Sequence, residues 1–98
     1  MSEQMDDAFY DRADEHIHLS NDQISGDIGR GKVSASMMYA TARFNAWVSA
    51  SGLKTAENMA DSKEEIVSYF VEQYQKMLEE NIDDYISHFE EYMFFDEQ

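Results

Sequence analysis

Hydrophobic residues recur every three or four positions along most of the chain, which is the spacing of amphipathic α-helices. The first such run covers residues 5–25, in which Met5, Phe9 and Ala13 fall on one side of a helix. Gly26 follows this run, and glycine takes the left-handed conformation that ends many helices at no steric cost. The pattern therefore predicts a first helix over residues 5–25 that ends at Gly26.

The second run, residues 33–52, differs from the rest of the chain because Arg43 is its only charged residue. Its large apolar side chains occupy one face, while alanines and serines occupy the opposite face. We expect a helix that is covered on more than one side, at the centre of a bundle, with the small-residue face allowing close approach of a neighbouring helix or a second subunit. Its serines, threonine and asparagine make it too polar for a membrane span.

The last third of the chain contains two apolar stripes, over residues 62–80 and 82–94. Ser62 and Glu65 have the spacing of a capping box, which marks the start of a helix. The second stripe is rotated by roughly 100° from the first, so one straight helix cannot present both on a single face. Asn81, a favoured N-cap residue, predicts a break there, and the last two helices then form one kinked helix or two nearly continuous ones.

Composition supports an all-α fold. The 98 residues contain no proline and only four glycines, so the turn residues that strands and hairpins need are scarce. We expect a single domain over residues 1–98, a small bundle of three to four helices, with residues 1–4 and 95–98 frayed. The absence of cysteine suits a reducing cytoplasm, and no signal peptide or membrane span is expected.

The formal charge of −14, from 21 acidic and seven basic residues, limits the kinds of partner. It repels nucleic-acid phosphates and anionic lipids, so neither direct nucleic-acid binding nor membrane binding is expected. An acidic surface steers a protein toward basic partners. One variant of this hypothesis is a nucleic-acid mimic that occupies a basic nucleic-acid-binding protein.

Three segments carry a resemblance to a known family. They are FYDRADEHIHLSND, RGKVSASMMYATARFNAW and YFVEQYQKMLEENIDDYISHF. Together they resemble a family of short, acidic, helical proteobacterial proteins that is known only as a domain of unknown function. The resemblance runs from about Phe9 to Tyr92 and is strongest over Arg30–Asn45. It implies a bacterial, cytoplasmic origin and brings no catalytic residue.

The segment GDIGRGKVS, residues 26–34, partly matches the Gly-x-x-x-x-Gly-Lys-Ser/Thr loop that binds nucleotide phosphates. Gly26, Gly31 and Lys32 fit that pattern, but Val33 stands where the Mg²⁺-binding hydroxyl should be. The loop should also leave a buried strand, whereas a helix precedes it here. We therefore expect an interhelical turn without a nucleotide.

Histidines and carboxylates raise the possibility of a metal site. Glu15 and His18 have the Glu-x-x-His spacing found in di-iron bundles, but such sites need two of these pairs and two more glutamates. Both residues also fall on the solvent side of the first helix. His16 is expected to be partly buried at the edge of the apolar stripe, and His88 is a further weak candidate ligand. No metal or other cofactor is expected.

Arg43, with Tyr39, Asn45 and Trp47, forms the candidate binding patch of the second helix. A lone arginine on an otherwise uncharged helix either pairs with a carboxylate of a neighbouring helix or contributes to a recognition surface.

The leading functional hypothesis is a non-enzymatic protein-interaction or regulatory module whose partner is another protein, and the helices also allow a homodimer. The alternative is a small metal-binding four-helix protein that uses His and carboxylate ligands.

Overall fold

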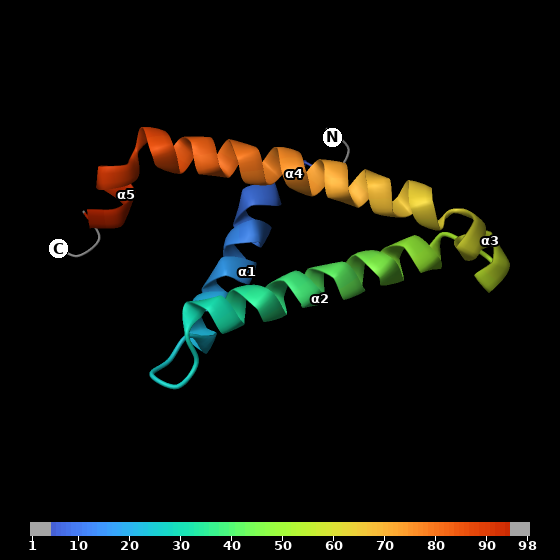
Figure 1. Cartoon of the computed structure of the whole chain (residues 1–98), viewed down its shortest axis with the longest axis horizontal. Helices are drawn as coiled ribbons and strands as arrows, with labels where there is room; N and C mark the ends of the chain where they lie inside the picture. Colours follow the sequence, from blue (N-terminus) through green and yellow to red (C-terminus); the bar gives the residue numbers. More distant parts are fainter. Residues whose placement is uncertain (1–4, 95–98) are drawn as a thin grey trace. The chain divides into compact units, whose positions relative to one another are not determined.

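A computed structural model describes residues 5–94, and this part of the chain is helical without strands (Figure 1). The all-α prediction is confirmed. The termini that were expected to fray, 1–4 and 95–98, lie outside the described residues. Within 5–94 there are five helices: α1 (Phe9–Gln23), α2 (Arg30–Ser51), α3 (Ala56–Asp61), α4 (Lys63–Ser87) and α5 (Phe89–Phe94).

The described residues fall into two units, and the boundary between Trp47 and Val48 lies inside α2. The first unit holds α1 and most of α2. The second holds the end of α2 and the three later helices, in which α4 contacts both α3 and α5. A single domain and a packed bundle of three to four helices remain predictions.

Helix α1 is shorter than expected at both ends. The Phe9 amide donates to the carbonyl of Asp6 at 3.1 Å, and Arg12 holds the Asp6 carboxylate at 2.9 and 3.2 Å, so the chain turns before the helix begins. At the other end Ile24 is extended, with φ −73° and ψ 130°. The prediction of a left-handed Gly26 cap is wrong, since no described glycine has a positive φ.

The turn between α1 and α2 is closed by Ser25. Its hydroxyl accepts hydrogen bonds from the amides of Asp27 and Ile28 at 3.2 and 3.1 Å, and its own amide donates to the carbonyl of Ile28 at 2.9 Å. Helix α2 then begins at Arg30, three residues earlier than predicted. The carbonyl of Gly29 makes this possible because it accepts the first helical hydrogen bonds.

A short helix, α3, lies between the second and third predicted helices. Thr55 caps it, because its hydroxyl accepts a hydrogen bond from the amide of Asn58 at 3.0 Å. Ser62 lies between α3 and α4, and α4 begins directly after it, as predicted for the third helix. Its side chain makes no capping hydrogen bond, however, so the predicted capping box is absent.

Helix α4 continues through the predicted break at Asn81. The Asn81 side chain donates to the carbonyl of Met77 at 2.7 Å, four residues earlier, instead of capping a new helix. The interruption lies at His88, whose φ of −126° and ψ of 31° leave the helical region. The predicted boundary at residues 80–82 is therefore wrong. The last helix, α5, begins after His88 and is much shorter than predicted.

A single chain buries very little of its apolar surface. Val33, at 4% exposure, is the one described residue that is fully buried. It lies on α2 near the contact of that helix with α1, where the hydroxyl of Ser20 lies 3.2 Å from the sulfur of Met37. The aromatic and aliphatic side chains that were expected to form a core are mostly exposed on α2 and α4. Their helical spacing was predicted correctly.

Candidate interaction surface

Helix α2 presents a row of large side chains at four-residue spacing. Tyr39, Arg43 and Trp47 follow one another by slightly more than one helical turn, so they lie along one side of the helix. Tyr39 is 68% exposed and Trp47 is 63% exposed, and Arg43 is exposed between them. Asn45 is half-buried and lies elsewhere around the helix. The structure thus brings three of the four predicted patch residues together.

Phe44 extends this row, although the sequence reasoning left it out of the patch. Its ring centroid lies 5.7 Å from that of Trp47, and the side chain is 61% exposed. The three-residue spacing of these two aromatics was the available signal. We define the α2 face as the side of the helix formed by Ser36, Tyr39, Ala40, Arg43, Phe44 and Trp47.

None of the ion pairs present within residues 5–94 involves Arg43. The pairs present in that range join Asp6 to Arg12 and Asp84 to His88. An exposed guanidinium between aromatic side chains retains its hydrogen-bond donors for a ligand or partner.

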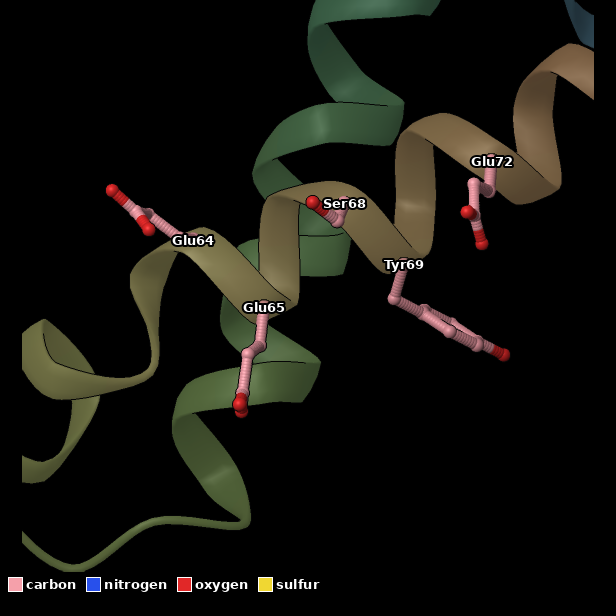
Figure 2. Close-up of a pocket in the computed structure, with 5 residues that line it drawn as sticks. All are labelled: Glu64, Glu65, Ser68, Tyr69 and Glu72. Atoms are coloured by element: carbon pink, nitrogen blue, oxygen red, sulfur yellow. The ribbon is translucent and has the colours of Figure 1, made fainter.

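A shallow depression on α4 is lined by acidic side chains. Glu64, Glu65, Ser68, Tyr69 and Glu72 all come from this one helix (Figure 2). Their side chains fan out from the ribbon instead of converging on a common point (Figure 2). Three carboxylates without an opposing wall make a solvated acidic surface and do not enclose a ligand.

The junction of α4 and α5 holds a compact polar and aromatic cluster. The Tyr92 hydroxyl donates to the carboxylate of Asp84 at 3.1 Å, and the His88 ring stacks on that of Tyr92 with centroids 5.3 Å apart. Nδ1 of His88 lies 3.3 Å from the same carboxylate, which makes an ion pair when the imidazole is protonated. The Asp84 hydrogen bond raises the pKa of Tyr92. This cluster fixes the start of α5, and its four-residue spacing was visible in the sequence.

The candidate metal ligands do not assemble within the described residues. Glu15, His16 and His18 are exposed on α1, so the expected partial burial of His16 is wrong, and His88 lies at the other end of the chain. Residues 5–94 contain no group of three or more histidine or carboxylate side chains arranged to hold a metal ion.

The glycine-rich segment has the geometry of a turn. A phosphate loop needs backbone amides that point at the ligand, but the amides of Asp27 and Ile28 are bound to Ser25. Lys32 lies in the first turn of α2, and a helix precedes the segment. Residues 26–29 lie in the expected turn between α1 and α2, whereas residues 30–34 already belong to α2.

A protein-family model described as "Protein of unknown function (DUF3144)" matches residues 9–86. The chain therefore belongs to this family, which confirms the resemblance found in the sequence. No curated protein and no solved structure shows a significant match to the chain. No helix within residues 5–94 has the length and apolar character needed to cross a membrane.

Proposed function

We propose that this member of a family of unknown function is a non-enzymatic, cytoplasmic protein-interaction module that binds another protein chain through the α2 face. One observation carries the proposal. Tyr39, Phe44 and Trp47 expose more than three fifths of their surface on a helix that carries no acidic residue, in an otherwise acidic chain.

The residue types on the α2 face support a protein partner. Tyrosine, tryptophan and arginine dominate the binding energy of protein interfaces, since they combine a large contact area with a polar group. The aromatic pair of Phe44 and Trp47 gives the face a large and partly ordered apolar centre. Apolar surface of this kind that stays in contact with water marks an interaction site in a folded protein.

The charge distribution determines the kind of partner. With a net charge of −14, the chain repels nucleic acid and anionic lipid, whereas the α2 face itself holds no carboxylate. The face thus accepts an apolar partner surface without burying an acidic group. The acidic residues of the other helices keep the chain soluble and disfavour nonspecific association.

Site-specific photo-crosslinking in the native cells tests the proposal. The photoreactive amino acid p-benzoylphenylalanine replaces Tyr39 in one full-length variant and Tyr10 in the control. Tyr10 is a matched control because it is a tyrosine on α1 with a nearly equal exposure of 67%. We expect a discrete protein adduct from position 39 and no comparable adduct from position 10.

The mass and identity of the adduct decide the outcome. A discrete adduct with any protein chain at position 39 supports the module. The absence of an adduct at position 39, or equal adducts from both positions, would contradict it, because the α2 face would then not be a selective protein contact.

A further inference from the structure

We infer that the occupant of the α2 face is a second copy of this chain, packed antiparallel to the first about a two-fold axis that crosses α2 between residues 41 and 42. This inference rests on the proposed function because it uses the same surface. It adds the identity of the partner and the pairing of residues across the interface.

The spacing of residues on the α2 face is that of a helix-pairing seam. Positions 36, 40, 43 and 47 are separated in turn by four, three and four residues. An alternation of four and three averages 3.5 residues, the repeat that keeps one side of a helix facing a partner helix over several turns. The seam occupies α2 beyond Val33, the residue that is buried near the contact with α1.

The antiparallel register matches large side chains with small ones. Trp47 of one copy lies opposite Ser36 of the other, and Arg43 lies opposite Ala40. Tyr39 and Phe44 face each other at the sides of the seam and form an aromatic pair twice, once on each side of the axis. A two-fold axis requires such a self-complementary surface, because each residue pair occurs twice.

Charge favours α2 as the place where two copies meet. Two chains of charge −14 repel each other wherever their carboxylates face, and both α1 and α4 carry several acidic residues. Helix α2 carries none. Arg43 of each copy lies near Tyr39 of the other in the antiparallel register, where a guanidinium and an aromatic ring attract each other.

The area available for burial approaches the lower limit for a specific interface. Tyr39, Phe44 and Trp47, exposed by 68%, 61% and 63%, offer together about 400 Å² per chain for burial, on typical areas for aromatic side chains. Two copies thus bury about 800 Å² from these residues alone. The alanine, serine and arginine of the seam raise the total toward the roughly 1,200 Å² at which stable interfaces begin.

Cysteine crosslinking tests the register directly, because the natural chain has no cysteine. In the full-length chain, Ala40→Cys places two thiols near the axis, with Cα atoms about 7–10 Å apart for packed helices. Ala42→Cys is the control, since it lies about 160° around the helix from residue 40. A short bismaleimide should crosslink the Ala40→Cys variant at least tenfold faster than the control. Equal rates, or faster reaction of the control, would overturn the register.

Sedimentation equilibrium of the full-length natural chain tests the dimer itself. We expect a mass near twice the chain mass of 11.4 kDa. Trp47→Glu places a carboxylate in each half of the seam and should yield monomers with unchanged helical circular dichroism. Leu19 lies on α1 and is 58% exposed, close to the 63% of Trp47, so Leu19→Glu is the control that should leave the dimer intact.

These measurements separate the two proposals. If the natural chain is monomeric while photo-crosslinking at residue 39 traps a different protein, the second copy is excluded and the interaction module stands. If neither a dimer nor an adduct is found, both fail. If Trp47→Glu loses its helical signal, the crosslinking rates still show whether the dimer forms, because the Ala40→Cys variant keeps Trp47.

Discussion

The hydroxyl of Tyr92 donates a hydrogen bond to Oδ2 of Asp84, 3.1 Å away, and so ties α5 to the last turn of α4. The ring of Tyr92 also meets that of Tyr85 edge-on, with centroids 4.9 Å apart, and stacks on the ring of His88. The path of the chain after residue 88 is therefore set by side chains within nine positions of one another. This local arrangement gives the first prediction.

Replacing Asp84 by Asn should lower the pKa of Tyr92. The Asp84 carboxylate accepts a hydrogen bond from the phenol and favours its protonated form, which raises the pKa of Tyr92 above its usual value of 10.0. The associated stabilisation is present below that usual value and is lost as the pH rises through the higher pKa of the folded chain. An NMR titration of the labelled Tyr92 ring measures the change. Asp83→Asn serves as the control, and an unchanged Tyr92 pKa in Asp84→Asn would contradict the assignment.

Replacing Arg12 by Gln should raise the pKa of Asp6. The hydrogen bonds from Arg12 stabilise the ionised carboxylate and hold the pKa of Asp6 below 3.8. The contribution of this pair is present above that value and is lost as the pH falls through the lower pKa of the folded chain. Carboxyl NMR titration gives the pKa, and amide exchange at Phe9 reports fraying of α1. Arg30→Gln should leave both unchanged, and a similar effect in that control would refute the specific pair.

Thr55→Ala should destabilise the second unit by about 1 kcal/mol, because it removes the hydroxyl that caps α3. Ser62→Ala should cost much less, since the side chain of Ser62 makes no capping hydrogen bond. Urea unfolding followed by circular dichroism compares the two variants. Equal losses of stability in the two variants, or a larger loss in Ser62→Ala, would show that Ser62 caps α4 as the sequence predicted.

Ser25→Ala should loosen the turn between α1 and α2. The substitution leaves the amides of Asp27 and Ile28 without their hydroxyl acceptor and costs about 1 kcal/mol of local stability. Hydrogen exchange at these two amides should accelerate several-fold. Ser34→Ala, on the exposed side of α2, should not change their exchange. Unaltered exchange in Ser25→Ala would show that the serine does not close the turn.

The sequence predicted the helices where the apolar spacing was long and regular. Residues 33–52 lie almost entirely within α2, because their apolar spacing is maintained over several helical turns. Ser62 directly precedes α4, because a serine followed by glutamates is typical of the start of a helix. Tyr39, Arg43 and Trp47 were also found together, since a four-residue spacing on a helix places them on one side.

Other features depend on contacts that the pattern does not encode. Asn81 resembles an N-cap in sequence, but its amide bonds the carbonyl of Met77 within a continuous helix. Gly26 resembles a cap, but the chain becomes extended at Ile24 before reaching it. An apolar stripe shows that a surface is to be covered and does not identify what covers it, so the spacing of the α2 aromatics does not distinguish the core of one chain from an interface.

The chain's single tryptophan lies on the α2 face, so its fluorescence tests the central claim most directly. Trp47 emission and its quenching by acrylamide should be recorded on the natural chain over a wide range of concentration. We predict a blue-shifted, protected emission at high concentration that becomes red-shifted and readily quenched on dilution, together with the fall in mass. Emission typical of an exposed tryptophan at every concentration would contradict the claim that a second copy covers this face.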